Sequence, residues 1–316
     1  MDRQLGYPNR RAPVRSRLSS VEQVRPATPL PVTVVIPTRN EAENIGHVLE
    51  LMPDVAELVV VDAYSDDGTI DVVLQHRPDA VIVLQKPAGR GNAVRAGLEV
   101  ATADYIVSMD GDGRMDPGEI PGYVALLAQG FDVVKGSRGA LGGRSSTELT
   151  PLRRAGNRGV AGLYNLMFRT RLSDITFGYI ALRRECLARL GLYADDRCIE
   201  VQILTHAQLA GLRLAELPSK EAEPIGGESH LSSFKDNREV LSTIVRARLS
   251  PGREWWRHVG SPAPSYEVLG QGRPAEDRID VTEQPVREMP AGRNGQAVRA
   301  PVIPRQRRMP GASSTA

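Results

Sequence analysis

The sequence predicts an α/β fold in which a mostly parallel central sheet is flanked by helices. Short runs rich in Val and Ile alternate along the chain with segments of helical periodicity, and this alternation is typical of βαβ units. The apolar runs are continuous, as expected for strands that are covered on both faces. With 316 residues, 41% of them hydrophobic, the chain is long enough for one large domain.

Five strands and four helices are expected in alternation. The expected strands cover 32–38, 57–63, 80–85, 105–110 and 131–137, and the expected helices cover 40–52, 68–77, 91–101 and 117–129. Sheets of this kind bind ligands outside the carboxyl ends of their strands. Polar residues that directly follow the strands are therefore the first candidates for a site.

The two ends of the chain differ in composition from its middle. Residues 1–30 are rich in Arg, Pro and Ser and lack periodicity, and Pro, Gly, Arg and Ser dominate 255–316. We expect both segments to be disordered tails. The folded domain is then expected at 31–254.

Several classes of protein are disfavoured by the composition. A net charge of +2 gives no indication of a nucleic-acid partner. Cys186 and Cys198 do not have the spacing of a zinc or disulfide motif, which predicts free thiols in a reducing cytoplasm. No secretory signal and no run of ~18 apolar residues is found. We expect a cytoplasmic protein, with peripheral contact to the inner face of the plasma membrane as an option.

A pair of carboxylates follows the fourth strand in "YIVSMDGDGRMDP" (105–117). Asp110 and Asp112, separated by one glycine, can direct oxygens at one hard cation such as Mg²⁺ or Mn²⁺. The alternative is an Asp-Gly turn with solvated charges. A turn does not explain why Glu41 and Asp62 should lie at the same edge, so a metal site is favoured. Asp116, just before Pro117, is predicted to cap a helix.

Further polar segments suggest phosphate contacts and helix caps. Gly89 and Arg90 open a helix in "KPAGRGNAVRAG" (86–97), where backbone N–H groups can bind an anion. Lys135 and Arg138 end the fifth strand and would complement the acidic pair as phosphate contacts. In the turn after the second strand, Asp67 or Thr69 is predicted to cap the next helix.

The motifs in their order resemble glycosyltransferase family 2 with the GT-A (Rossmann-like) fold. They are "VVIPTRNEAENI", "VVVDAYSDDGT", "GRGNAVRAG", "YIVSMDGDGRMDP" and "VVKGSR". Downstream, "LSDITFGYIALRRECL" (172–187) and "GGESHLSSFKDNREVLSTIVRAR" (226–248) are similar to the polyprenyl-phosphate (dolichol-phosphate) mannosyltransferase-like branch. The resemblance covers 32–249.

This resemblance implies a role for each matching residue. Asp110 and Asp112 would bind Mg²⁺ or Mn²⁺ and the sugar diphosphate. The implied nucleotide-sugar contacts are Pro37, Arg39, Glu41, Asp62, Gly89, Arg90 and Arg138. The stretch Ser173, Asp174, Thr176 and Gly178 would line the sugar and acceptor pocket. The implied acceptor or phosphate contacts are Arg153, Arg154, Asn157, Ser229 and His230.

Three positions depart from the family pattern. Asp62 stands alone where a pair of acids is usual, Arg114 replaces a Gln or Ser, and Gln202 occupies a second acidic position beside Glu200. Glu200 or Asp174 could be a general base; alternatively, Glu200 only interacts with the dipole of its helix. A lipid phosphate is already an anion, so its reaction requires little help from a general base. The missing second acid at Gln202 therefore favours a lipid phosphate as the acceptor.

The expected activity is that of a metal-dependent, inverting hexosyltransferase. It would move a hexose from a GDP- or UDP-linked sugar to a polyprenyl phosphate. One alternative keeps the donor but uses a soluble or glycan hydroxyl acceptor; another is a nucleotide-sugar-binding relative without transfer. Segments 153–171 and 237–259 combine apolar residues with flanking arginines and could contact a membrane, although 237–259 could instead be a final helix that packs on the domain.

Overall fold

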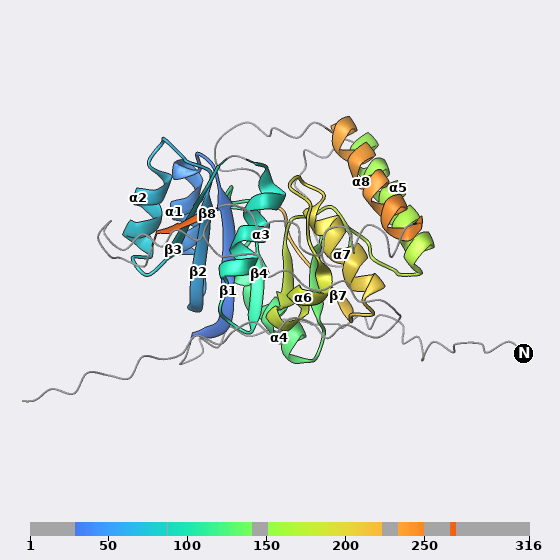
Figure 1. The fold of residues 1–316 in the computed structure, drawn as a ribbon, viewed down its shortest axis with the longest axis horizontal. Coiled ribbons are helices and arrows are strands. Elements are labelled where there is room, and N and C mark those ends of the chain that lie inside the picture. Colours follow the sequence, from blue (N-terminus) through green and yellow to red (C-terminus); the bar gives the residue numbers. More distant parts are fainter. Residues whose placement is uncertain (1–28, 87, 141–150, 223–232, 250–265, 270–316) are drawn as a thin grey trace, which may run out of the picture. The chain divides into compact units, whose positions relative to one another are not determined.

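An eight-stranded sheet lies at the centre of the part of the chain that the computed structural model describes (Figure 1). That part comprises residues 29–86, 88–140, 151–222, 233–249 and 266–269, all within the first of two compact units, Met1–Glu283. The strands are β1 (Leu30–Thr38), β2 (Val55–Asp62), β3 (Val81–Gln85), β4 (Tyr105–Ser108), β5 (Val133–Ser137), β6 (Ile180–Arg183), β7 (Leu214–Pro218) and β8 (Tyr266–Leu269).

The strands pair mostly in parallel, which confirms the predicted sheet type. Their order is β7-β5-β6-β4-β1-β2-β3-β8. β1 is parallel to β2 and β4, and β5 is parallel to β7, whereas β6 and β8 run antiparallel to their neighbours. The order changes direction at β1, since β2 and β3 lie on one side of it and β4 on the other. Ligands of open α/β sheets bind outside the strand ends at such a point.

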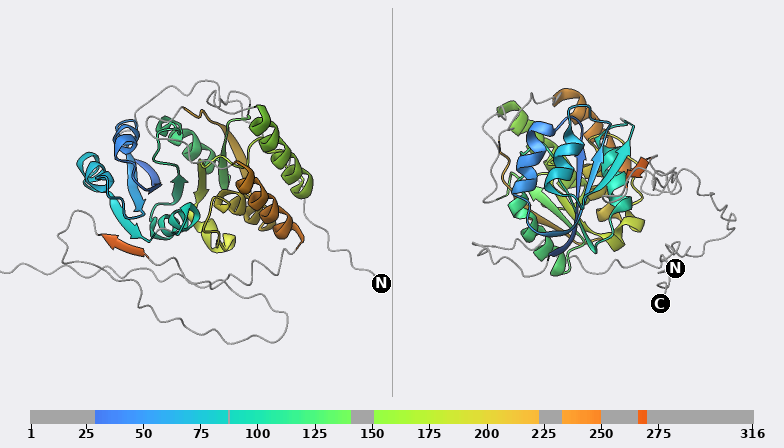
Figure 2. Two further views of the ribbon diagram at one scale, coloured as in Figure 1. Left: turned by 90° about the horizontal axis from the view of Figure 1, so that it is seen from above. Right: turned by 90° about the vertical axis from the view of Figure 1, so that its left-hand side faces the viewer.

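The four predicted helices are present, with small shifts at their ends. The helices are α1 (Ala42–Glu50), α2 (Thr69–His76), α3 (Arg90–Val100), α4 (Ile120–Ala128), α5 (Pro151–Phe168), α6 (Leu187–Leu190), α7 (Ile199–Leu209) and α8 (Ser233–Leu249), with short 3₁₀ turns η1 (Pro117–Glu119) and η2 (Arg184–Cys186). Both faces of the sheet are covered (Figure 2). On β1, Val34 and Ile36 pack with α1 and α4, whereas Val35 packs with α3, α5 and α7.

Helices α5 and α8 lie side by side and pack near α7 (Figures 1 and 2). On α8, Val240 and Ile244 are buried, and Arg248 Nε donates to the Met167 carbonyl at 3.1 Å. The helix therefore packs on the domain, as one of the two sequence interpretations expects. Leu166 on α5 and Leu249 on α8 remain exposed, at 78% and 73%. Among the helices that the structure describes, none is long and apolar enough to cross a bilayer.

Strand β8 lies beyond the predicted domain boundary at residue 254. Tyr266–Leu269 pairs with the free edge of β3, and Tyr266 and Val268 pack against the core on the α3 side. The expectation of a tail without structure from 255 onward is therefore wrong for these four residues. A four-residue strand is too short to stand out from the composition around it, and its pairing partner is distant in sequence.

Candidate active site

The loops after β1 and β2 are joined through Asp62, which is fully buried. The pairing of Thr38 with Asp62 brings the ends of the two strands together. The Asp62 carboxylate accepts hydrogen bonds from Thr38 Oγ1 at 2.8 Å and from the Ser65 N–H and hydroxyl at 2.7 Å each. Asp62 thereby orders the loop after β2. Its predicted contact with the nucleotide remains a prediction.

Asp67 caps two helices at once. Its carboxylate accepts the Ala42 N–H of α1 at 2.9 Å and the Thr69 N–H of α2 at 3.0 Å. The Thr69 hydroxyl accepts the Glu41 N–H at 2.9 Å. The capping role predicted for Asp67 is confirmed. The same is true of Asp116, which accepts the Gly118 N–H at 2.8 Å.

The residues expected to border a nucleotide follow β1. Pro37 is half-buried and Arg39 is exposed. Burial raises the pKa of Glu41, and the charge of Asp110 adds to this shift, while a hydrogen bond from Asn44 opposes it. The influence of Asp110 on Glu41 shows that the acids after β1 and β4 share one electrostatic environment.

Arg90, the first residue of α3, connects the acidic pair to α7. Its Nε donates to Asp110 Oδ1 at 2.7 Å, and its Nη1 donates to Glu200. Burial alone would lower the pKa of Arg90, but the two carboxylates keep it above its ordinary value, so the guanidinium stays charged. Arg90 Nη2 is buried and has no hydrogen-bond partner among the described residues. Nη2 can therefore donate a hydrogen bond to a further, anionic group.

Gly178 lies directly against this cluster. A Cβ at this position would stand 2.7 Å from Arg90 Nη2 and 3.1 Å from Asp110 Oδ2. The segment after α5 therefore reaches Asp110. This position is compatible with the expectation that Gly178 lines the sugar and acceptor pocket.

Gly89 and Gly91 are explained by packing. A Cβ at Gly89 would be 2.1 Å from the Asp195 carbonyl oxygen, and one at Gly91 would be 2.4 Å from that of Asp196. The Asn92 N–H at the start of α3 donates to the Asp195 carbonyl at 3.2 Å. The glycines thus allow the segment before α7 to lie on the start of α3, and the predicted anion contact of Gly89 remains a prediction.

The acidic pair after β4 has the donor chemistry of a divalent cation site. The side chains of Asp110 and Asp112 are 29% and 32% exposed, so both carboxylates can be reached from solvent. Burial and the charge of Asp110 raise the pKa of Asp112 to about 6, although the Arg114 N–H and guanidinium oppose the shift. The carboxylates repel each other, and a cation between them would relieve this repulsion. Asp110 and Asp112 therefore fit Mg²⁺ or Mn²⁺, which prefer such oxygen ligands.

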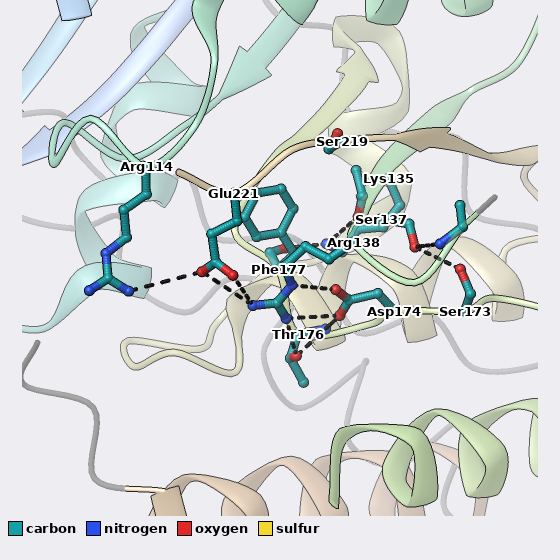
Figure 3. A network of polar contacts seen from close by, with 12 residues as sticks. Arg114, Lys135, Ser137, Arg138, Ser173, Asp174, Thr176, Phe177, Ser219 and Glu221 are labelled. Atoms are coloured by element: carbon teal, nitrogen blue, oxygen red, sulfur yellow. Dashed lines mark hydrogen bonds and ion pairs between the residues drawn. The ribbon is translucent and has the colours of Figure 1, made fainter. Parts of the chain in front are cut away.

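A second polar network surrounds Arg138 at the end of β5 (Figure 3). Its Nε donates to Asp174 Oδ2 at 2.6 Å, and its Nη1 donates to Glu221 Oε2 at 3.2 Å. The guanidinium also lies over the ring of Phe177, 4.9 Å from its centroid. Sequence reasoning identified Arg138 and Asp174 but missed Glu221, which follows β7 and has no local motif around it.

Lys135 points into the protein and not toward the edge of the sheet where the sequence suggests a phosphate contact. The side chain is fully buried, and its amino group donates to the carbonyls of Gly136 and Phe177. Burial lowers the pKa of Lys135 to about 8. The interpretation of Lys135 as a phosphate contact is therefore wrong, because its position on β5 directs the side chain into the protein.

The pKa values of the two candidate bases are shifted in opposite directions. Burial raises the pKa of Glu200 although Arg90 opposes the shift. Burial acts in the same direction on Asp174, but Arg138 and Lys135 outweigh it and hold that pKa well below its usual range. Asp174 is thus a poor proton acceptor, and Glu200 has the more suitable pKa.

Part of the predicted acceptor side cannot be compared with the structure. Ser229 and His230 lie outside the described residues. Arg153 and Arg154 belong to the first turn of α5, where the structure describes the backbone only, and Asn157 on the same helix is half-buried. Their phosphate contacts remain predictions.

Known proteins resemble this chain in sequence and in fold. Residues 33–191 match the family described as glycosyl transferase family 2. A dolichyl-phosphate hexose transferase of Haloferax volcanii is 30% identical over 222 residues, which cover 69% of this chain and 94% of the relative. A polyprenol monophosphomannose synthase of Mycolicibacterium smegmatis is 32% identical over 251 residues, covering 72% and 93%. An uncharacterized glycosyltransferase of Mycobacterium tuberculosis is 34% identical over 201 residues, covering 64% and 89%.

A solved structure supports the fold assignment. Glucosyl-3-phosphoglycerate synthase from Mycobacterium tuberculosis, crystallised with Mn²⁺, UDP and glucosyl-3-phosphoglycerate, superposes with a TM-score of 0.53 at 20% identity. The match covers 69% of this chain and 79% of that chain. At this level of identity the likeness concerns the fold.

Proposed function

The chain belongs to glycosyl transferase family 2, and on this premise we propose that it moves a hexose from a nucleotide sugar to a polyprenyl phosphate. The observation that carries the proposal is the cluster of Asp110, Asp112, Arg90 and Glu200. It lies where the strand order changes direction between β1 and β4. That is where an open α/β sheet binds a nucleotide.

For the donor, we propose that Asp110 and Asp112 hold Mg²⁺ or Mn²⁺. The cation would supply positive charge to the diphosphate that leaves in the reaction. Solved structures of the same fold are complexes with Mn²⁺ or Mg²⁺ and UDP, so these ions and UDP are the first probes to use. The predicted contacts on the nucleotide side are Pro37, Arg39, Glu41, Asp62 and Gly89.

Arg90 has two tasks in this proposal. Its ion pair with Asp110 keeps one carboxylate oriented, and the ion pair with Glu200 keeps α7 against the site. Nη2 of Arg90, which has no hydrogen-bond partner among the described residues, would donate to an oxygen of the nucleotide sugar. Removing Arg90 would therefore leave Glu200 buried without its partner and would remove one donor contact.

The acceptor side favours a group that is already charged. Glu200 is buried and occupied by Arg90, and Asp174 is held ionised by Arg138. A polyprenyl phosphate needs little proton removal, whereas a hydroxyl acceptor would require one of these carboxylates as a base. The names of two relatives, a dolichyl-phosphate hexose transferase and a polyprenol monophosphomannose synthase, support the lipid acceptor. Attack opposite the leaving group inverts the anomeric configuration.

A lipid acceptor requires contact with a bilayer, for which we propose the pair α5 and α8. Each helix exposes a leucine, Leu166 or Leu249. Arg246 and Arg248 lie in the last turn of α8, where they could interact with anionic headgroups. Replacing Leu166 by Ser should weaken binding to vesicles of anionic phospholipid by roughly 10- to 150-fold, because burying one leucine contributes about 1.5–3 kcal/mol. Exposed Leu74 on α2 provides the matched control, and Leu74→Ser should leave vesicle binding unchanged.

The acceptor is tested by a transfer assay with the purified protein. Radiolabelled GDP- and UDP-linked hexoses are incubated with bacterial polyprenyl phosphate and Mn²⁺, and label is counted in the organic phase. The proposal expects label in the lipid for one donor class. Label that appears only on a soluble or glycan hydroxyl would favour the second acceptor class. Donor binding without any transfer would favour a nucleotide-sugar-binding protein.

A further inference from the structure

Arg114 lies between the carboxylates of Asp112 and Glu221, and Figure 3 shows its guanidinium directed toward Glu221. Its Nε is 3.5 Å from Asp112 Oδ2, and its Nη1 is 4.0 Å from Glu221 Oε1. Both distances exceed the ~2.8 Å of a hydrogen-bonded ion pair. A small movement of the side chain can therefore close either contact at the expense of the other.

The backbone holds Glu221 in this place. Met115 and Glu221 form an isolated antiparallel bridge, and the Ala222 N–H donates to the Arg114 carbonyl at 2.8 Å. These contacts fix the segment after β7 against the loop that carries Asp112. Side-chain substitutions at Arg114 or Glu221 should therefore leave the two segments in register.

The surroundings of Arg114 and Glu221 limit the screening of their interaction by solvent. The side chains of Arg114 and Glu221 are 14% and 8% exposed. Glu221 also accepts from Arg138 Nη1 at 3.2 Å, and this contact orients its carboxylate. Arg114 thus meets a fixed carboxylate on one side and the more exposed Asp112 on the other.

We propose that Arg114 is a built-in counter-ion of Asp112 that a divalent cation must displace, and that Glu221 is the positioning residue that receives the guanidinium. The inference rests on the proposed function in which Asp110 and Asp112 bind the cation. An arginine and a divalent cation at the same carboxylate repel each other, so the arginine competes with the metal. A second carboxylate within reach lowers the cost of moving the guanidinium away.

The two residues then have opposite effects on metal affinity. Arg114→Gln removes the competitor, and Mn²⁺ should bind roughly 3- to 10-fold tighter, the range of one partly screened charge interaction. Glu221→Gln removes the receiving carboxylate, and Mn²⁺ should bind weaker by a similar factor. The double variant should behave as Arg114→Gln alone, because Glu221 acts through Arg114.

The test is a Mn²⁺ titration of the full chain without donor, followed by calorimetry or by the EPR signal of free Mn²⁺. Arg114→Lys keeps the charge and should stay close to the wild type, while Asp112→Asn locates the site by loss of binding. Thermal unfolding verifies that each variant is folded. A merely structural role of Arg114 or Glu221 would not change Mn²⁺ affinity in opposite directions.

The results separate this inference from the metal site itself. If Asp112→Asn loses Mn²⁺ but Arg114→Gln binds it no tighter than the wild type, the competition is refuted and the metal site stands. If Glu221→Gln binds as the wild type does, its positioning role is refuted. If neither the wild type nor Arg114→Gln binds Mn²⁺ through Asp112, both the proposed metal site and this inference fail.

Discussion

The acidic residues at the end of β2 and those around Arg138 are held by different kinds of partner. After β2, Asp62 is held by two hydroxyl groups and one N–H, and Asp67 by backbone N–H groups and a hydroxyl. In contrast, Asp174, which lies before β6, and Glu221, which follows β7, are held by the guanidinium of Arg138. The loop after β2 is thus held by neutral donors, and the network around Arg138 by buried ion pairs.

This difference has energetic consequences. A neutral donor that is lost leaves a carboxylate with its other hydrogen bonds, whereas a lost guanidinium leaves buried charges without compensation. Asp110 and Asp112 are intermediate in character between the two regions. Each carboxylate has an arginine neighbour, as in the ion pairs, but remains partly exposed.

The largest effect is expected from Arg138→Met, which leaves Asp174 and Glu221 without their shared partner. We expect the free energy of unfolding to fall by about 3–5 kcal/mol, as for other broken buried ion pairs. Urea unfolding measures this, and Arg158→Met on the exposed surface of α5 should change it by less than ~0.5 kcal/mol. If Arg138→Met changes the free energy of unfolding as little as this control does, the ion pairs of Arg138 do not stabilise the fold.

Asp112→Asn should stabilise the metal-free protein near neutral pH. The folded-state pKa of Asp112 is about 6, above its ordinary value of 3.8. Its contribution to stability is therefore present below pH 3.8 and is lost as the pH rises through 6. With its partial exposure taken into account, we expect the variant to be more stable than the wild type by about 1–3 kcal/mol at neutral pH.

The measurement is urea unfolding in EDTA at several pH values between acid and neutral. The advantage of Asp112→Asn should disappear toward pH 4. Added Mn²⁺ should stabilise the wild type and not the variant. An advantage that does not depend on pH would refute the electrostatic explanation.

The smallest of the stability effects is expected at Asp62, which neutral donors hold. Thr38→Val removes one hydroxyl from Asp62, which keeps both contacts to Ser65. The free energy of unfolding should fall by about 1–2 kcal/mol, as for one hydrogen bond to a buried carboxylate. Thr102→Val, at an exposed threonine, is the control. A loss as large as that of Arg138→Met would remove the contrast between the two regions.

The same contrast explains how much the sequence could predict. Continuous Val and Ile runs identified β1 to β5, and the local residue pattern identified the caps Asp67 and Asp116. The apolar runs and the caps depend only on residue types and on neighbours in the chain, so the sequence alone is enough to predict them. The acids at the sheet edge could be grouped because the carboxyl ends of parallel strands share one edge.

The partners in the buried ion pairs could not be predicted in this way. Arg90 and Glu200 are separated by 110 positions, and Arg138 and Glu221 by 83. No spacing rule connects residues so far apart, and the pairing depends on how β6 and β7 enter the sheet. For the same reason the neighbour of Arg114, Glu221, could not be predicted, because it depends on the segment after β7 crossing the loop after β4.

The central claim is that the carboxylates after β4 form the metal and diphosphate centre of a sugar transferase. It is tested most directly by comparing hexose transfer to polyprenyl phosphate by the wild type, Asp110→Asn and Asp112→Asn, each with EDTA and with Mn²⁺. Transfer by the wild type should require the cation, and both folded variants should lose at least about 10²–10³-fold in rate, the loss typical of removing a charge-stabilising group. Full transfer by either variant, or by the wild type in EDTA, would contradict the account.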